Sequence, residues 1–153
     1  MVLTGVQKIV AEMAQDHGLE PSLALAIAEV ESGFDPYASR YEVGFRYFDR
    51  TVKRPRTCSI QTELNHQATS WGVMQVMGIV ARELGHTGWL TELVRPELGA
   101  ALGCLFVLRK MEKYGKLGIN SVIPSYNAGK PVAGNQAYVA KVLEAKTRWG
   151  KEL

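Results

Sequence analysis

Glu31 is the residue of this chain whose surroundings best suit it to acid chemistry. It follows an almost wholly apolar run, from Leu23 to Ala28, and it precedes Ser32 and Gly33. A carboxylate in apolar surroundings is disfavoured as an anion, so its pKa should rise toward the range of a general acid near neutral pH. Glu31 is therefore a candidate proton donor.

The run that leads to Glu31 has the signals of one helix. Pro21 suits the first helical position, and Gly33 is a residue common just past a helix end. Residues four apart share a face, so Ile27 and Glu31 lie on one stripe, which carries the carboxylate to the edge of the core. Glu29 lies on another side of the helix and is a rival acid, because spacing alone does not say which of the two is exposed. Solvated charges at a helix end are the alternative for both.

The rest of the chain indicates further helices around one long irregular stretch. From Asp35 to Thr69 the helical periodicity fades, and near-alternating aromatic and charged residues over 41–48 indicate a short hairpin. We expect a mainly α fold, α+β at most, as a single domain over 1–153 with a long insertion at about 41–69. The expected helices cover 4–18, 21–33, 73–84 as two short pieces broken at Gly78, 96–115, 117–127 and the stretch after Asn135.

The composition limits the classes of partner and cofactor. The 153 residues fit one domain, and the net charge of +3 is modest. Basic residues concentrate at Lys53-Arg54-Pro55-Arg56, which is most simply a solvated loop; attraction to an anionic cell-envelope surface is the alternative, and nucleic acid is not expected as a partner. Because His17, His66 and His86 lack ligand spacing, no metal and no cofactor are expected.

Cysteine usage and the amino terminus bear on where the protein works. Cys58 and Cys104 are too few for a disulfide scaffold, so two free thiols are expected. The stretch 1–8 lacks the basic start and long apolar core of a secretion signal, and no stretch reaches the roughly 18 apolar residues of a membrane span. We expect a monomer that is soluble as made, in the cytoplasm, without membrane insertion.

Three short strings stand in order along the chain: Glu31-Ser32-Gly33-Phe34-Asp35-Pro36, Gly72-Val73-Met74-Gln75-Val76-Met77 and Tyr126-Asn127-Ala128-Gly129. Together they resemble the soluble lytic transglycosylase (SLT) domain, a lysozyme-like family that cleaves peptidoglycan. The first is similar to the catalytic Glu-Ser of the family, the second to its Gly-Leu-Met-Gln motif with Val73 in place of Leu, and the third to its Tyr-Asn-Ala-Gly motif. Three matches in order are much harder to produce by chance than any one of them.

The resemblance implies a helical domain with a substrate cleft and selects Glu31 over Glu29 as the catalytic residue. It places Gln75 and Asn127 at the N-acetyl and hydroxyl groups of a sugar, which suits amides because they both donate and accept hydrogen bonds. The structural alternatives are a buried amide that joins loops for Gln75, a helix-end cap for Asn127, and packing for Tyr126, Met74 and Tyr138. The other substrate-binding candidates are Met74, Tyr126, Tyr138 and Glu42.

The implied reaction cleaves the β-1,4 bond between N-acetylmuramic acid and N-acetylglucosamine without consuming water. Glu31 would protonate the leaving oxygen, and the 2-acetamido oxygen of the sugar would take the place of a nucleophile. The same carboxylate would then remove the C6 hydroxyl proton, so that a 1,6-anhydro ring closes. A hydrolytic muramidase resembling goose-type lysozyme is the closest alternative and would add a second carboxylate such as Glu42 or Asp35. A non-catalytic glycan-binding virion module is the alternative of another class.

The residues around position 40 indicate a biological context. Arg40 stands where many members of the family have a Ser nine positions after the Glu. The string Arg40-Tyr41-Glu42, followed by Ala68-Thr69-Ser70-Trp71-Gly72, resembles the variant of bacteriophage-encoded members. This implies a phage endolysin or virion enzyme that acts on peptidoglycan strands in the periplasm or cell wall and arrives there without a visible signal peptide.

Overall fold

The first two helices begin and end where local signals place them. Helix α1 (Gly5–Asp16) starts at a capping box, in which the Thr4 side chain accepts from the Gln7 N–H and the Gln7 side chain accepts from the Thr4 N–H. Helix α2 (Pro21–Ser32) has proline in its first turn and ends at Gly33, whose φ of 62° is left-handed. Both predicted helices are confirmed in this computed structural model, which describes residues 2–131 and 135–153.

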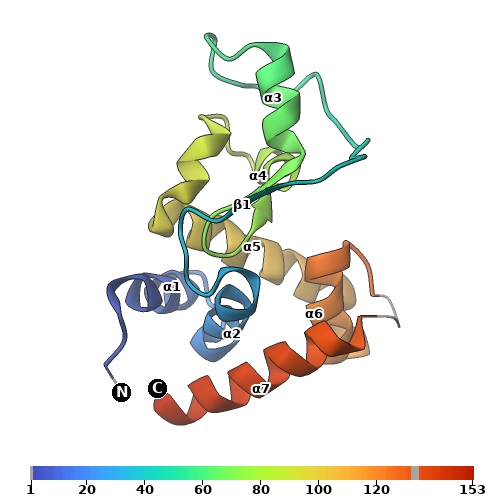
Figure 1. Cartoon of the computed structure of the whole chain (residues 1–153). Coiled ribbons are helices and arrows are strands. Elements are labelled where there is room, and N and C mark those ends of the chain that lie inside the picture. The colour runs from blue at the N-terminus through green and yellow to red at the C-terminus, as the bar shows by residue number, and fades with distance from the viewer. Residues whose placement is uncertain (1, 132–134) are drawn as a thin grey trace.

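Helix α2 runs through the core of the molecule. All of its residues from Ser22 to Ala28 are buried, as expected for a helix that is apolar on every side. It packs against α1 and against α7 (Gln136–Glu152), and Figure 1 shows α7 passing below it. The polar end of α2, where Glu31 lies, is therefore carried outward from the core.

Three long helices complete this part of the protein and confirm the expected segments. They are α5 (Pro96–Tyr114), α6 (Ile119–Ala128) and α7. Asn135 precedes α7 as expected, yet its side chain makes no capping bond; it donates instead to Asn127 Oδ1, at 2.8 Å. Short 3-10 turns precede and follow α5, at Leu90–Val94 and Gly115–Leu117.

The sheet is three short antiparallel strands: β1 (Ser39–Tyr41), β2 (Thr69–Trp71) and β3 (Val76–Met77), in the order β1-β2-β3. The hairpin predicted within 41–48 is wrong, because β1 ends at Tyr41 and pairs with β2 across the whole intervening segment. The aromatic residues that produced the alternation pack on one another in a loop, with Phe45 against Tyr47 and Phe48. A distant pairing partner leaves no mark in the local pattern.

Two other expectations fail in the same region. Residues 60–67 form helix α3 (Ile60–Gln67), which begins at a Ser59 cap and lies within the stretch predicted to be irregular. The two short helices expected over 73–84 reduce to one, α4 (Gly78–Glu83), since 76–77 form β3. Gly78 lies so close to the end of α3 that a Cβ there would be 2.1 Å from the carbonyl oxygen of His66. Long-range packing therefore sets this boundary.

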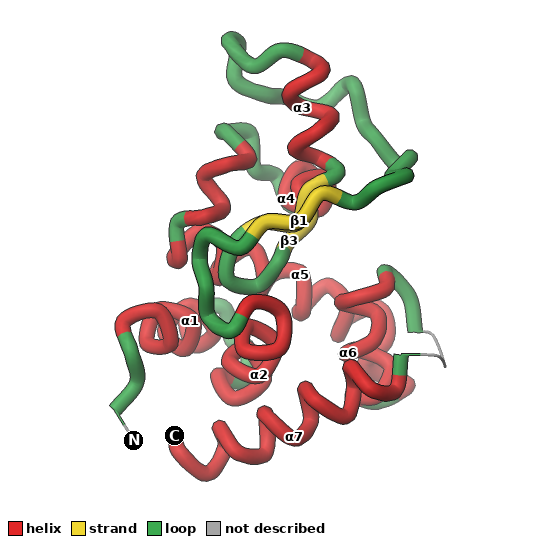
Figure 2. The backbone as a smooth tube through the Cα atoms, in the orientation of Figure 1, coloured by secondary structure: helices red, strands yellow, loops and turns green. Residues whose placement is uncertain are grey.

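The elements form two parts joined by α5. Helices α1, α2, α5, α6 and α7 pack together, while the sheet, α3 and α4 lie on the other side (Figure 2). Helix α5 contacts α1 and α6 in the first part and β3 in the second. Cys58 and Cys104 are free and buried. No helix among the described residues is both long and apolar enough to span a membrane.

Candidate active site

A pocket of about 190 Å³ opens between the two parts. Helix α2 contributes Glu31, the sheet contributes one wall, and α5 and α6 contribute the opposite side. The pocket collects residues that are far apart in sequence, which are Glu31, Arg40, Glu42, Ser70, Gln75, Met77, Phe106, Tyr126 and Asn127.

Ser32 fixes the end of the helix that carries Glu31. Its hydroxyl donates to the Val73 carbonyl at 2.7 Å and lies 3.2 Å from the Ala28 carbonyl of the preceding turn. The turn that contains Val73 is itself held closely, because Gly72 has φ of 74° and a Cβ there would lie 2.2 Å from the Leu93 carbonyl oxygen. The first and second sequence strings are therefore in direct contact.

The Glu31 carboxylate lies in surroundings that oppose its charge. Burial raises its pKa, while hydrogen bonds from Tyr138 and Asn127 and the positive charge of Arg40 lower it; burial outweighs them, so the pKa stands above its ordinary value. Tyr138 Oη donates to Glu31 Oε1 at 2.6 Å. Burial and the nearby carboxylate also raise the pKa of Tyr138, which keeps its hydroxyl protonated as the donor. Glu31 thus has the properties of a general acid.

The sheet presents one row of side chains to the pocket. Arg40 of β1 lies directly opposite Ser70 of β2, which lies opposite Met77 of β3, and all three line the pocket. Residues opposite each other in a sheet point to the same face. Glu42 follows β1 into the same pocket and pairs with Arg40 at 3.8 Å, with both side chains largely exposed. A second carboxylate therefore shares the pocket with Glu31.

Gln75 holds two backbone segments together and also lines the pocket. Its amide nitrogen donates to the Ala38 and Gly72 carbonyls, both at 2.9 Å, and so joins β1 to the turn before β3. Its φ of 50° is unusual for a residue other than glycine, and such strain gathers at functional sites. Both amide hydrogens are occupied, so its amide oxygen is the group that remains for a ligand.

Helix α6 places Tyr126 and Asn127 on the pocket. The Tyr126 hydroxyl donates to the Met74 carbonyl at 2.7 Å, and its ring packs at 5.1 Å from that of Phe106. Asn127 is exposed and supports the Glu31 anion. Buried Lys110 donates to the Gly129 carbonyl at 2.7 Å and so holds the end of α6 to α5. The third string therefore meets the first two at Glu31.

Comparison with known proteins gives the same family as the three strings. Residues 8–147 match the family described as "Transglycosylase SLT domain". The chain belongs to this family. A stretch of 33 residues is 58% identical to the membrane-bound lytic murein transglycosylase C of Actinobacillus pleuropneumoniae serotype 5b and to that of serotype 3. The stretch covers 22% of this chain and only 9% of each of those proteins. No solved structure matches the chain significantly.

Some sequence candidates lie apart from the pocket of this SLT domain. Met74 is fully buried, and a Cβ on Gly103 would lie 2.5 Å from its sulfur, so its side chain packs in the core and has no surface for a sugar. Asp35 accepts the Tyr37 N–H at 2.9 Å in an exposed turn beside Pro36.

Glu29, the rival of Glu31, is committed to α7. It accepts from Arg148 at 2.6 Å and from the indole N–H of Trp149 at 2.7 Å. These bonds hold α7 on α2, and α7 in turn carries Tyr138 to Glu31. The rival carboxylate therefore positions the donor that contacts the acid.

Four residues of the pocket were not among the sequence candidates: Arg40, Ser70, Met77 and Phe106. The departure from the family Ser was the one signal at Arg40. Ser70 and Met77 reach the pocket through strand pairing, which only the tertiary structure reveals. The sequence pattern places Phe106 on the apolar face of α5 and gives no sign that it lines a pocket. Among the described residues, no three His, Cys, Asp or Glu side chains gather where they could hold a metal ion.

Proposed function

We propose that this chain is a peptidoglycan lytic transglycosylase that cleaves the β-1,4 bond between N-acetylmuramic acid and N-acetylglucosamine and leaves a 1,6-anhydro end. One observation carries the proposal. In a chain that belongs to the SLT family, a partly buried carboxylate with a raised pKa faces the pocket between the two parts and accepts a hydrogen bond from Tyr138.

The raised pKa of Glu31 suits the first step. Its carboxylic acid gives a proton to the glycosidic oxygen as the bond from C1 breaks, while the 2-acetamido carbonyl oxygen of the same sugar attacks C1. The departing N-acetylglucosamine carries away the proton as a hydroxyl. Glu31 is then an anion, and the Tyr138 hydroxyl and the Arg40 charge stabilise it.

The second step returns the proton. The Glu31 carboxylate takes the proton of the C6 hydroxyl, O6 attacks C1, and the acetamido group leaves with its electron pair. The 1,6-anhydro ring closes, Glu31 is again an acid, and no water is consumed. The mixed environment of Glu31 suits both steps, because burial favours the acid while its polar partners support the base.

Sugar recognition is assigned to the polar groups around Glu31. The free amide oxygen of Gln75 accepts from a sugar N–H or hydroxyl, and exposed Asn127 both donates and accepts. Tyr126 and Phe106 provide ring surface on the side of α5 and α6. Met74 supports the site through its carbonyl, which holds the Tyr126 hydroxyl.

A hydrolytic muramidase is the second candidate, favoured by the position of Glu42 in the same pocket. A hydrolase needs a second carboxylate to activate water or act as a nucleophile. The Arg40 partner of Glu42 counts against this function, since it holds that carboxylate as an ion pair. Glu42→Gln therefore distinguishes the two: a transglycosylase keeps its products and most of its rate, whereas a hydrolase stops.

Mass spectrometry of the fragments released from purified peptidoglycan tests the proposal. Wild type should release fragments with 1,6-anhydro ends. Each is about 18 Da lighter than the hydrolytic product, because hydrolysis adds one water molecule at each cut and this reaction adds none. Glu31→Gln should release none, and Glu29→Gln, measured below its unfolding temperature, should release the same anhydro fragments as wild type. Reducing ends from wild type would contradict the transglycosylase, and a Glu31→Gln variant as active as wild type would leave only a glycan-binding module.

We also assign the enzyme to phage-mediated degradation of the host cell wall. The resemblance of the strings at 40–42 and 68–72 to phage-encoded members supports this context. When fused to an export signal, the protein should lyse cells from the periplasm, and the Glu31→Gln form should not. Lysis by both forms would contradict an enzymatic role there.

A further inference from the structure

The net charge of the protein is concentrated in one segment, residues 42–59, which we call the basic loop. It carries five basic and two acidic residues, a net charge of +3, which equals that of the whole chain. The rest of the chain is balanced, with thirteen basic and thirteen acidic residues. A localised positive field of this kind attracts anionic partners.

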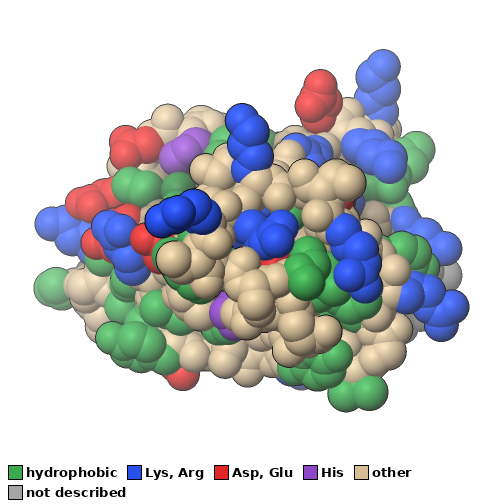
Figure 3. Space-filling model, turned by 90° about the horizontal axis from the view of Figure 1, so that it is seen from above, with side chains coloured by type: hydrophobic (Ala, Val, Ile, Leu, Met, Phe, Trp, Pro, Cys, Tyr) green, Lys and Arg blue, Asp and Glu red, His purple; other side chains and the backbone are tan. Residues whose placement is uncertain are grey.

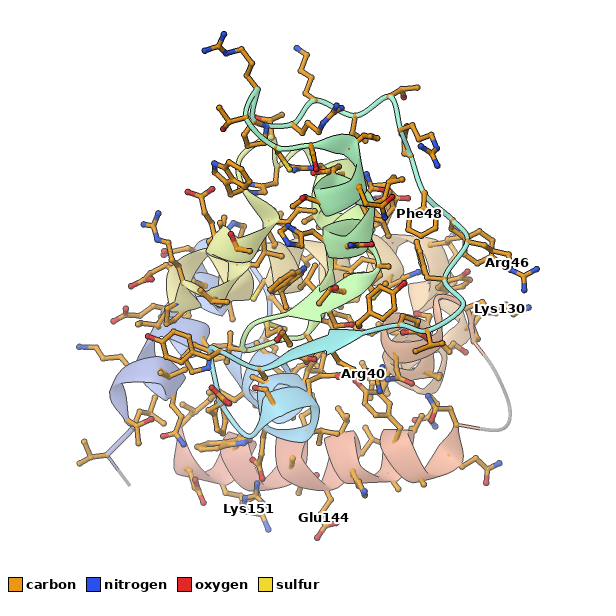
Figure 4. The ribbon with its side chains drawn as sticks, turned by 45° about the horizontal axis from the view of Figure 1, so that its top comes forward. Arg40, Arg46, Phe48, Lys130, Glu144 and Lys151 are labelled. Atoms are coloured by element: carbon orange, nitrogen blue, oxygen red, sulfur yellow. The ribbon has the colours of Figure 1, made fainter. Side chains whose placement is uncertain are left out.

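The basic side chains of the loop are available to a partner. Arg46, Arg50, Lys53 and Arg56 are exposed, and within the described residues no hydrogen bond or ion pair engages any of these four. Figure 4 shows Arg46 pointing away from the body of the protein. The view from above in Figure 3 shows basic side chains over the middle and right of that face, with few acidic ones among them.

Aromatic rings accompany these charges. Phe45 packs edge-on against Tyr47 and Phe48, at 5.8 and 5.1 Å between centroids, and the Tyr47 side chain is nevertheless 77% exposed. Tyr41, the last residue of β1 and directly before the loop, is 53% exposed. Exposed ring faces held in a cluster are unfavourable in water unless a partner covers them.

The loop is fixed by a buried polar network. Gln67 of α3 accepts the Asp49 N–H at 2.9 Å and donates to the Asp49 carbonyl at 2.8 Å. The same amide donates to Glu63, which forms a paired hydrogen bond with Arg82, both at 2.8 Å. Both charged groups are almost fully buried. The backbone between Arg46 and Arg50 is thus anchored at Asp49, so this part of the loop is already ordered before a partner binds.

The loop is also continuous with the active site. It begins at Glu42, which lines the pocket beside Glu31, directly after the strand that carries Arg40. A polymer that occupies the pocket therefore passes close to the loop. On the proposed function, that polymer is a peptidoglycan strand, and its peptide stems carry carboxylates that guanidinium groups bind in paired geometry.

We propose that the basic loop is a second binding surface for the peptidoglycan strand, with Arg46, Arg50 and Lys53 contacting peptide-stem carboxylates beyond the pocket and Tyr47 covering apolar surface of the strand. The inference rests on the proposed substrate but not on the bond-cleaving step. Binding at the loop raises the effective concentration of the strand at the pocket.

Sedimentation of the full chain with insoluble purified peptidoglycan tests this inference. Every protein carries Glu31→Gln, so the strands stay intact. The test variant is Arg46→Gln/Arg50→Gln/Lys53→Gln, and the matched control, Lys8→Gln/Lys116→Gln/Lys151→Gln, removes the same charge from exposed positions elsewhere. We expect the test variant to bind about tenfold more weakly than its parent and the control to bind within about twofold. Raising the salt to about 0.5 M should remove the difference.

A chemically modified substrate tests whether the peptide-stem carboxylates are the groups that the loop binds. Peptidoglycan whose peptide carboxyl groups have been amidated should bind the parent as weakly as ordinary peptidoglycan binds the test variant. Equal binding of both variants, undiminished binding to amidated material, or tighter binding to lipopolysaccharide vesicles or to DNA would each overturn the proposal. Product analysis of the active enzyme is independent, so reducing ends there would refute the transglycosylase and leave the loop result standing.

Discussion

At the scale of single residues, the site depends on the balance of forces on Glu31. Burial raises its pKa most strongly, and Tyr138, Arg40 and Asn127 oppose that shift. A carboxyl group in purely apolar surroundings would make a good acid and a poor base. The partners therefore decide how readily the same group takes a proton back, and Tyr138 is the closest of them, at 2.6 Å.

Removal of the Tyr138 hydroxyl should weaken this support. In Tyr138→Phe the pKa of Glu31 rises further, because a hydrogen bond that lowers it is gone. The fall of kcat/KM at high pH, which follows loss of the acid proton, should move to higher pH. The rate at its optimum should drop about ten- to a hundredfold, the value of a hydrogen bond to a charged group. A pH profile on soluble peptidoglycan fragments measures both.

The matched control for that variant is Tyr126→Phe. Its hydroxyl donates to the Met74 carbonyl and not to Glu31, so its loss should lower the free energy of unfolding by about 1 to 3 kcal/mol. The high-pH limb of the profile should stay in place. If both variants moved the limb equally, the direct bond from Tyr138 would not be the cause.

At the scale of elements, each part of the fold delivers one face of the site. Helix α2 is held at its end by Ser32, and α7 is held on α2 by Glu29. On the other side, the buried Glu63–Arg82 pair joins α3 to α4, and Arg82 also donates to the His86 and Gly88 carbonyls. Burial raises the pKa of Glu63, but the hydrogen bonds from Arg82 and Gln67 outweigh it and lower the pKa.

The buried pair permits a direct comparison with an exposed one. Glu63→Gln leaves the Arg82 charge buried without a partner and should lower the free energy of unfolding by roughly 3 to 5 kcal/mol. Glu83→Gln breaks an exposed pair with Arg109 and should change it by about 0 to 1 kcal/mol. Urea unfolding of both variants measures the difference, and equal effects would show that the α3–α4 network does not stabilise the fold.

Glu63→Gln should also release the basic loop. Gln67, which holds Asp49, is itself bound to Glu63, so its orientation depends on the pair. Limited proteolysis should cut the variant within 42–59 at protease concentrations that leave wild type intact. Protection equal to wild type would mean that Gln67 holds the loop without help from the ion pair.

At the scale of the whole molecule, the site lowers the stability of the fold. A carboxylate whose pKa is raised by folding binds its proton more tightly in the folded state than in the unfolded state. Folding is therefore disfavoured where the group must be ionised, above the raised pKa, and the penalty disappears below the pKa of the unfolded chain. Such a carboxylate is retained for chemistry and not for stability.

Glu31→Gln should consequently stabilise the protein in a pH-dependent way. The amide keeps an oxygen for the Tyr138 hydroxyl and removes the ionisation, so the unfolding temperature should rise at pH 7 to 8. The gain should shrink as the pH falls through the raised pKa and vanish near pH 4, about the value of a free glutamate. Calorimetric melts across this range measure it, and a gain that is the same at every pH would show that ionisation of Glu31 is not the cause.

The sequence determined much of this protein because local chemistry was sufficient for it. Caps, prolines and glycines set α1, α2 and α5 correctly, since each signal acts within a turn of the residue that carries it. The apolar run before Glu31 predicted the direction of its pKa shift. The three strings led to the family, which the match over 8–147 confirms.

Tertiary structure alone decided the rest, because those features depend on partners far along the chain. The pairing of β1 with β2 put Arg40, Ser70 and Met77 in one row, which no local alternation could reveal. The docking of α7 brought Tyr138 into contact with Glu31, which lies 107 residues earlier in the sequence. It also engaged Glu29 in bonds to α7, so the structure distinguishes the acid in the pocket from the other carboxylate of α2. Spacing fixes which face of an element a residue occupies, and only packing fixes what that face meets.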